Sequence, residues 1–222
     1  MTGPGARGQR RPAAIRWAAF ACILAVFWLT PLLLGGPRSA LDRSVLAALR
    51  AGDHLALVQG FLFITHLGSW VTLSVLSSGA AAWLALKQRV RDALILLVTV
   101  WGVRVAVELQ KLWIDRARPG DEHLVDVHSA SFPSGHAANS LVTYLMMAAL
   151  LFGTRTSVVI ALMLSFLIGL SRPILGVHWL SDVIAGWAFA FCCAILALSM
   201  RSGRSDGILV SRMRTGNPPE VR

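Results

Sequence analysis

The feature that most restricts the fold of this chain is a series of apolar runs, each long enough to cross a lipid bilayer. A bilayer-spanning helix needs about 20 mostly apolar residues. The chain has 222 residues, of which 55% are hydrophobic, and its mean hydropathy is +0.64. Because lipid offers no partners for backbone N–H and C=O groups, such runs fold as helices that satisfy their own backbone. The sequence therefore predicts an all-α, polytopic membrane helical bundle.

Breakers and charged residues divide these runs into six expected transmembrane helices within a domain of residues 15–200. The expected spans are residues 15–35, 69–86, 92–114, 137–152, 156–171 and 180–200. His66, Gly68 and Ser69 interrupt the long apolar stretch 55–86, so we expect a short membrane-dipping or packing helix before the second span. The first run is too long for the apolar region of a signal peptide, which has about 7–15 residues, so we expect it to stay uncleaved. Residues 1–14 are expected to be disordered, and residues 201–222 to form a flexible basic tail. Both ends are expected to be cytoplasmic.

Residues 40–50 predict a short helix between the first two spans. Leu41, Val45 and Leu49 would share one face of it, with the arginines elsewhere. This pattern is typical of a helix that lies on the membrane surface. A plain connecting helix is the alternative interpretation.

Positive charge is distributed along the chain as a topology signal. The formal net charge is +10, but the arginines cluster at the ends of the apolar runs instead of forming a separate basic segment. With six spans, the side that carries both termini holds nearly twice as many lysines and arginines as the other, which places it in the cytoplasm. We therefore expect a multi-pass protein of a bacterial inner (plasma) membrane and no nucleic-acid partner.

Three short segments concentrate the chemistry of the chain, in which only 14% of residues are charged. They are Lys111–Pro119 (KLWIDRARP), Pro133–His136 (PSGH) and Ser171–Asp182 (SRPILGVHWLSD). Charged groups are costly in lipid, so clusters of them are candidates for a functional site. The expected topology places all three segments on the outer, periplasmic face at a similar depth. Together they can form one site.

The third segment contains a possible nucleophile. His178 and Asp182 are four residues apart, so on a helix they would share a face and could hydrogen-bond. A carboxylate that binds one ring nitrogen fixes the tautomer and leaves the other nitrogen free to attack. The alternative is an N-terminal helix cap beside an ordinary interfacial histidine.

The cations and the PSGH segment are suited to an anionic substrate. Lys111 and Arg118 would extend to lipid head groups if they stood alone, but Arg172 adds a third cation next to the histidine. Arginine forks and a lysine charge together suit phosphate. Ser134 and Gly135 would begin a helix whose free N–H groups favour an anion. His136 could then act as a general acid, or else be a plain interfacial residue.

The motifs K-x6-R-P, P-S-G-H and S-R-x5-H-x3-D, in this order, resemble the signature of the type 2 phosphatidic acid phosphatase superfamily. The resemblance covers about residues 60–195, and the six-span layout also fits it. It implies an α-helical bundle and metal-independent dephosphorylation through a phosphohistidine, without a cofactor.

The same resemblance implies a role for each matching residue. His178 would be the nucleophile, Asp182 the residue that orients it, and His136 the acid that protonates the leaving group. The residues implied to bind phosphate are Lys111, Arg118, Ser134, Gly135 and Arg172. The resemblance implies no metal site.

The leading hypothesis is an integral-membrane phosphatase that hydrolyses a lipid phosphate or diphosphate taken from the membrane. Undecaprenyl diphosphate is the favoured substrate, followed by phosphatidic acid and phosphatidylglycerol phosphate. The alternative is a phosphotransferase that passes phosphate from the same phosphohistidine to a lipid or sugar acceptor. A soluble vanadate haloperoxidase is disfavoured by the hydrophobicity, and a non-catalytic lipid-binding or transport protein by the complete set of candidate catalytic residues. The oligomeric state does not follow from the sequence.

Two further charges lie inside the expected third span. Arg104 and Glu108 are four residues apart, and Glu108 precedes Lys111 by one helical turn. They could neutralise each other and fix helix packing, which is the interpretation we favour, or Glu108 could hold Lys111 in place.

Overall fold

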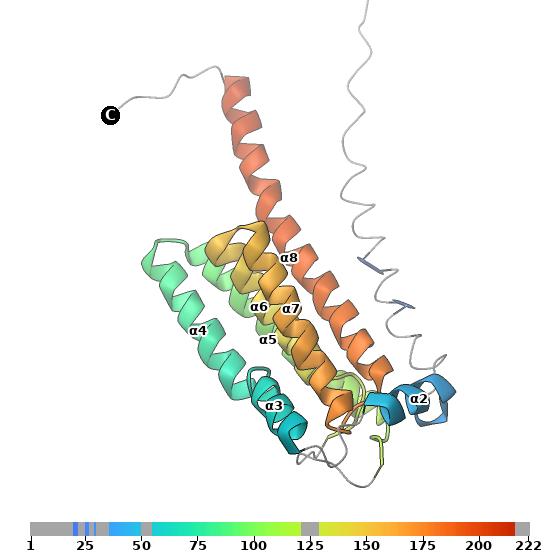
Figure 1. Ribbon diagram of the computed structural model, residues 1–222. Helices are drawn as coiled ribbons and strands as arrows, with labels where there is room; N and C mark the ends of the chain where they lie inside the picture. The colour runs from blue at the N-terminus through green and yellow to red at the C-terminus, as the bar shows by residue number, and fades with distance from the viewer. Residues whose placement is uncertain are drawn as a thin grey trace, which may run out of the picture.

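The computed structural model (Figure 1) describes residues 36–49, 55–120 and 129–215, with side chains described as far as residue 201. Phe20, Ala21, Ala25, Val26 and Leu29 are the only residues described before them. Most of the expected first span (15–35), the expected disordered residues 1–14, and residues 121–128 and 216–222 thus lie outside the described residues.

The described residues form helices joined by turns. In chain order the elements are η1 (Gly36–Arg38), α2 (Ala40–Leu49), α3 (Leu55–His66), α4 (Trp70–Leu86), α5 (Val90–Ile114), α6 (Gly135–Met147), the π-helical turn η2 (Ala148–Phe152), α7 (Arg155–Ile174) and α8 (Leu180–Thr215). Figure 1 shows α4 to α8 side by side as an upright bundle, with α2 across its lower end. The prediction of an all-α membrane bundle is confirmed.

Four stretches of the described residues are long and apolar enough to cross a membrane: Leu55–Leu86, Gly135–Phe152, Arg155–Ile174 and Leu180–Arg201. The last three begin and end within a few residues of the expected fourth, fifth and sixth spans. The 25-residue helix α5 lies within two residues of the expected helix 92–114. The count of six spans stays a prediction.

Local capping explains where several helices begin. Ser69 accepts a hydrogen bond from the N–H of Thr72 at the start of α4, and Thr154 accepts one from the N–H of Ser157 at the start of α7. Side-chain oxygens at these positions satisfy N–H groups that the first helical turn leaves free. The sequence placed both starts within two residues.

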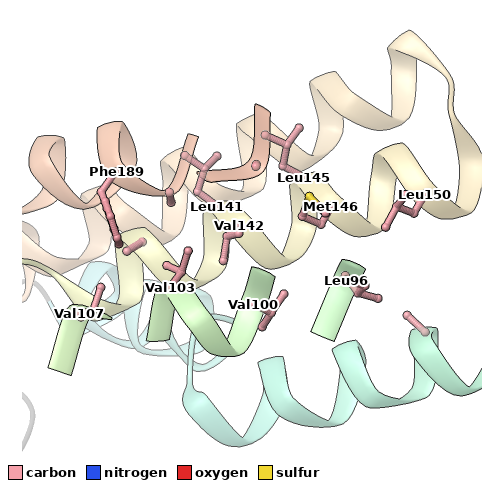
Figure 2. Close-up of a cluster of buried hydrophobic side chains, with 14 of the residues drawn as sticks. Leu96, Val100, Val103, Val107, Leu141, Val142, Leu145, Met146, Leu150 and Phe189 are labelled. Carbon is pink, nitrogen blue, oxygen red and sulfur yellow. The ribbon is translucent and has the colours of Figure 1, made fainter. Parts of the chain in front are cut away.

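The core of the bundle lies between α5, α6 and α8. One face of α5 repeats small and branched apolar residues at helical spacing, and it packs against the apolar face of α6 (Figure 2). The labelled side chains in this cluster are Leu96, Val100, Val103, Val107, Leu141, Val142, Leu145, Met146, Leu150 and Phe189. This packing fixes α6, whose first turn carries the PSGH segment, against α5, whose last turn carries Lys111.

Helix α8 approaches the start of α6 very closely at Gly186. A side-chain carbon at this position would lie 2.8 Å from the carbonyl oxygen of Ser134. The backbone N–H of Ser134 also donates to the carbonyl oxygen of Asp182, at 3.0 Å. The second and third polar segments are therefore joined through their backbones.

The long run Leu55–Leu86 is broken between α3 and α4, where the sequence predicted an interruption at His66, Gly68 and Ser69. The carbonyl oxygen of Leu67, which the break leaves free, accepts a hydrogen bond of 2.8 Å from the hydroxyl of Tyr144. Irregular backbone at membrane depth is tolerated where protein groups satisfy it in this way. The break brings Gly68 to the edge of the site described below.

The two remaining helices differ from the expectations in detail. In α2, Leu41 is exposed, but the residue buried against the bundle is Asp42, which the expected apolar face did not include. Helix α8 continues to Thr215, past residue 200 where we expected the last span to end. The flexibility of the tail stays a prediction.

Candidate active site

A cavity of about 250 Å³ lies at the end of the bundle next to the break between α3 and α4. Six of the eight site residues that we predicted line it: Lys111, Arg118, Gly135, His136, Arg172 and His178. The other two, Ser134 and Asp182, are fully buried and lie behind this lining. The three polar segments thus meet in one place.

The contact between His178 and Asp182 exists, but its structural basis is not the one we expected. His178 lies just before α8, so the two residues do not share a helical face. Instead the chain turns into the helix, and His178 Nδ1 lies 3.5 Å from Asp182 Oδ2. The N–H of Trp179 donates to the same Oδ2 at 3.0 Å. Asp182 therefore caps the start of α8 and also faces the histidine, which combines both interpretations of the sequence.

The free ring nitrogen of His178 faces a cation. Its Nε2 lies 3.2 Å from Arg118 Nη1. Because a guanidinium can only donate, Nε2 is the acceptor and the ring proton sits on Nδ1, on the side of Asp182. The lone pair of Nε2 thus points towards the cationic side of the cavity.

Burial and charge both act on this histidine. His178 is 2% exposed. Burial, followed by the positive charges of Arg118, Arg172 and Lys111, holds the pKa of His178 well below its ordinary value of 6.5. The ring is therefore neutral, which is its nucleophilic form, at pH values where a free histidine would be protonated.

The three cations are held by different parts of the chain. Arg118 donates to the carbonyl oxygens of Ser129 and Val177, each at 2.7 Å. Lys111 Nζ lies 3.2 Å from both Glu108 Oε1 and Ser129 Oγ. Arg172, buried in the last turn of α7, donates to Thr65 Oγ1 of α3 at 2.6 Å.

Among the described residues, Arg104 and Glu108 do not form the ion pair that we predicted. Glu108 pairs with Lys111 instead. Our favoured interpretation of these two charges was therefore wrong. Glu108 holds Lys111 beside the cavity, as in the interpretation we had set aside.

Several buried polar atoms at the site have no partner among the described residues. They are Arg172 Nε, Ser134 Oγ and Asn139 Oδ1. Leaving a buried polar group unsatisfied costs about 1–3 kcal/mol. Two of these atoms are donors, and Ser134 also begins α6, where free N–H groups and the helix dipole favour an anion. The side of the cavity formed by Arg172 and the start of α6 is thus complementary to phosphate.

His136 and Gly135 form the first turn of α6 on the other side of the cavity. Gly135 lets this turn approach Lys111, since a side-chain carbon there would lie 3.6 Å from Nζ. At Gly68 an added carbon would lie 3.1 Å from the ring of His136 and 2.4 Å from Ile168. The ring of His136 therefore has room beside the break only because residue 68 has no side chain.

A second layer of residues, which the sequence did not predict, lies behind His178 and Asp182. Arg116 Nη1 donates to Asp182 Oδ1 at 2.8 Å and to Ser181 Oγ at 3.0 Å, and both side chains of this ion pair are buried. Ser131 Oγ donates to the other oxygen, Oδ2. In the motif Arg116 occupies an unspecified position, and Ser131 is one serine in a loop. The one sequence signal for Arg116 was that the segment DRARP contains an arginine besides Arg118.

Asp42 extends this layer to the helix α2. It accepts hydrogen bonds from the backbone N–H of Ser181 at 3.0 Å and from its hydroxyl at 2.6 Å. A residue 139 positions away thereby caps α8 and fixes the hydroxyl that Arg116 contacts. No sequence pattern links an aspartate in a short surface helix to this turn.

The described residues contain no cluster of three or more histidine, cysteine, aspartate or glutamate side chains that could hold a metal ion. Of the acidic residues near the first segment, Asp115 is described and exposed, whereas residues 121–128 lie outside the described part of the chain.

Membrane-spanning helices and a buried, neutral histidine that faces three cations define the class of protein: a helical membrane enzyme built to act on phosphate groups. The profile of the PAP2 superfamily matches residues 92–206. This range is half of the chain and includes all three motifs. The chain belongs to the PAP2 superfamily, and it is a phosphoric ester hydrolase.

Curated relatives agree with this assignment. Phosphatidylglycerophosphatase B of Bacillus subtilis is 33% identical over 133 residues, which are 56% of this chain and 66% of that protein. The match thus spans just under two thirds of that relative. Decaprenylphosphoryl-5-phosphoribose phosphatase of Mycobacterium tuberculosis is 32% identical over 146 residues, 64% of this chain and 77% of that protein.

Solved structures show the same fold. A transmembrane PAP2-type phosphatidylglycerolphosphate phosphatase from Bacillus subtilis superposes with a TM-score of 0.75 at 25% identity, covering 83% of this chain and 96% of that one. LpxE of Aquifex aeolicus superposes with a TM-score of 0.62 at 25% identity, covering 73% and 97%. The chain therefore shares the fold of these bacterial membrane phosphatases.

Proposed function

We propose that this protein hydrolyses the terminal phosphate of a membrane lipid through a phosphohistidine on His178. The observation that supports this best is the position of Nε2, which shares one cavity with Lys111, Arg118 and Arg172 and keeps its lone pair free of a proton. A neutral imidazole next to three cations is suited to attack a phosphorus atom whose oxygens the cations neutralise.

The reaction has two steps. In the first, Nε2 forms a bond to phosphorus while the bond from phosphorus to the lipid oxygen breaks, and His136 gives its proton to that leaving oxygen. Asp182 stabilises the positive charge that develops on the ring of His178. In the second, a water oxygen attacks the phosphorus, His136 takes its proton, and the N–P bond breaks to release phosphate.

The remaining site residues would bind the phosphate oxygens. The Arg118 and Arg172 guanidinium groups and the Lys111 ammonium face the cavity, where they would bind the oxygens that gain charge. Ser134 Oγ and the first N–H groups of α6, at Gly135, would bind one more oxygen. The unpartnered atoms Ser134 Oγ and Arg172 Nε would gain partners in this way.

The location of the reaction follows from charge and from the fold. The cavity lies near the end of α5 and the start of α6, which in the expected six-span topology is the side that carries fewer lysines and arginines. By the positive-inside rule this is the periplasmic or outer side, with both termini in the cytoplasm. The substrate would thus be a lipid of the outer leaflet of a bacterial inner membrane.

The names of the two curated relatives describe a shared substrate chemistry. One acts on a phosphate carried by phosphatidylglycerol, the other on the 5-phosphate of a ribose that bears a decaprenylphosphoryl group. In both, a small polyol separates the terminal phosphate from a lipid-linked phosphate. We include this chemistry in the proposed substrate class. Undecaprenyl diphosphate, which we favoured from the sequence, remains a prediction within the same class.

Phosphate release in EDTA tests the proposal. We expect the purified full-length protein in detergent to release phosphate from at least one of phosphatidylglycerol phosphate, undecaprenyl diphosphate and phosphatidic acid, at the same rate with EDTA as with added magnesium. The reason is that cationic side chains, rather than a metal ion, neutralise the phosphate oxygens. Strict dependence on magnesium would contradict the mechanism. Turnover only with an added lipid or sugar acceptor would support the phosphotransferase instead.

The pH dependence provides a second test. We expect kcat/KM to be bell-shaped, because His178 must be neutral while His136 is protonated. Since the pKa of His178 lies well below 6.5, activity should persist as the pH falls through 6.5 and decline only well below it. The lipid phosphate itself loses a second proton near pH 6. The pKa of this step is measured separately by ³¹P NMR, and the pH profile of kcat/KM is corrected for it. A flat profile, or an acid limb centred on 6.5, would contradict the assignment.

A further inference from the structure

The cavity extends beyond the residues that the mechanism uses. Besides the residues that the mechanism uses, it is lined by Gly68 and Trp70 from the region of the α3–α4 break and by Arg104 and Glu108 of α5. Ser129 and Asn139 complete the lining. Arg104 precedes Lys111 by seven residues, which in an α-helix is about 10 Å along the axis. Because α5 runs from Val90 to Ile114 with Lys111 at the end that carries the site, Arg104 lies deeper in the bundle.

Arg104 is an unusual residue for this position. It lies between two indole rings, with its guanidinium carbon 5.3 Å from the ring centres of both Trp70 and Trp101. Its Nη1 lies 3.5 Å from Ser74 Oγ, at the limit of a hydrogen bond. The ion pairs formed among the described residues do not include it. The tryptophans hold the cation in place by cation–π attraction without neutralising its charge.

A cation inside a membrane bundle without a carboxylate partner is costly to maintain, and such residues mark binding sites or ion paths. Glu108, the carboxylate one turn away on the same helix, pairs with Lys111 instead. Arg104 is half-buried and lines the same cavity as His178. Its positive charge is therefore available to a ligand that occupies this cavity.

We infer that Arg104 binds a second, lipid-linked phosphate, so that the site selects lipids whose terminal phosphate is separated from the lipid phosphate by a small polyol. This inference rests on the proposed function, since it assumes that the terminal phosphate occupies the cations around His178. The lipid-linked phosphate then lies on the bilayer side of the cavity, where Arg104 is. A glycerol or a ribose bridges the gap between the two anion sites.

The spacing also disfavours other lipids at this contact. In a diphosphate the two phosphates share one bridging oxygen, so they lie closer together than the two phosphates of a glycerol- or ribose-bridged lipid and are less suited to bind both sites at once. Phosphatidic acid has a single phosphate and brings only ester groups to this position. Selectivity for the bridged bisphosphate lipid therefore depends on one side chain.

Substrate selectivity of an Arg104→Gln variant tests the inference. We expect kcat/KM for phosphatidylglycerol phosphate to fall roughly tenfold to a hundredfold further than kcat/KM for phosphatidic acid, as for the loss of one charge-assisted hydrogen bond. Arg104→Lys should restore part of the difference. The matched control is Arg91→Gln, the same substitution at the other end of α5, where Arg91 is exposed and donates to the carbonyl oxygen of Met200. An equal fall for both lipids, or no fall, would overturn the inference.

Binding of soluble head groups separates this inference from the proposed function. In full-length protein carrying His178→Ala, which prevents turnover, we expect ribose 1,5-bisphosphate to bind at least tenfold more tightly than ribose 5-phosphate in calorimetry. Adding Arg104→Gln should remove this advantage. Equal affinities before that substitution would overturn the second phosphate site, whatever the activity assays show. Failure of the wild-type protein to hydrolyse any lipid would overturn the proposed function. The binding experiment would still test the second phosphate site, because it does not depend on hydrolysis.

Discussion

Phosphate release should fall by roughly 10⁴-fold or more when His178 is replaced by alanine, because removal of a covalent nucleophile leaves only binding and electrostatic effects. In the wild-type protein, brief exposure to a ³²P-labelled lipid followed by rapid denaturation should trap label on the chain. That label should be stable in base and released by acid, as expected for a phosphorus–nitrogen bond. The variant should trap none.

The matched control for this experiment is His66→Ala. His66 ends α3, is exposed and does not line the cavity. Its backbone carbonyl, which the substitution keeps, accepts hydrogen bonds from the N–H of Ser69 and the hydroxyl of Thr72. Its activity and its labelling should match the wild-type protein. Full activity of His178→Ala, or acid-labile label in it, would assign the nucleophile to another residue. A melting temperature close to the wild-type value confirms that the variant is folded.

Loss of Arg116 should affect both stability and activity. In Arg116→Met, the fully buried carboxylate of Asp182 loses its ion-pair partner. Removal of one member of a buried ion pair costs about 3–5 kcal/mol, because it leaves an uncompensated charge. We expect a clear fall in the melting temperature in detergent. Activity should fall as well, because Asp182 no longer holds the ring of His178 in position.

A double-mutant cycle identifies the origin of this effect. Asp182→Asn removes the negative charge, so adding Arg116→Met to it should lower the melting temperature much less than Arg116→Met does alone. Arg116→Lys, which keeps the charge but not the fork, should be intermediate in both stability and activity. Equal losses in the two backgrounds would show that Arg116 acts through its other contacts, such as the ring of Phe132, 4.8 Å away.

The helices could be predicted closely from the sequence because lipid imposes simple rules on it. The expected starts at residues 69, 137 and 156 lie within two residues of those of α4, α6 and α7. Side-chain caps and breakers act locally, so the sequence alone contains this information. The predicted break near Gly68 was confirmed for the same reason.

The local geometry of the third segment was predicted less well. The spacing of His178 and Asp182 suggested two residues on one helical face, but α8 begins only at Leu180. Four residues of separation bring side chains together in a helix and also across a capped helical start, and spacing alone does not distinguish these. Asp182 caps the start of α8 and therefore faces His178. The two side chains thus contact each other although they do not share a helical face.

The supporting residues could not be predicted because their partners are distant in sequence. Arg116 reaches Asp182 across 66 positions, and Thr65 reaches Arg172 across 107. Each partner is an ordinary residue in its own segment. Only the tertiary packing of α2, α3, α7 and α8 brings them together. The charges of Arg104 and Glu108 were misinterpreted in a similar way, since neighbours in sequence were assumed to be partners.

The bond between Asp42 and Ser181 has a consequence for how the protein matures in the membrane. During synthesis, α2 emerges long before α8, and the bonds from Asp42 that support the turn presenting His178 can form only after α8 has been inserted and has met α2. Contacts of such long range form late because the chain must first close a large loop. A nascent chain that still lacks its last helix therefore contains Lys111, Arg118 and His136 but no nucleophile in position. Activity would thus begin only once assembly in the bilayer is complete.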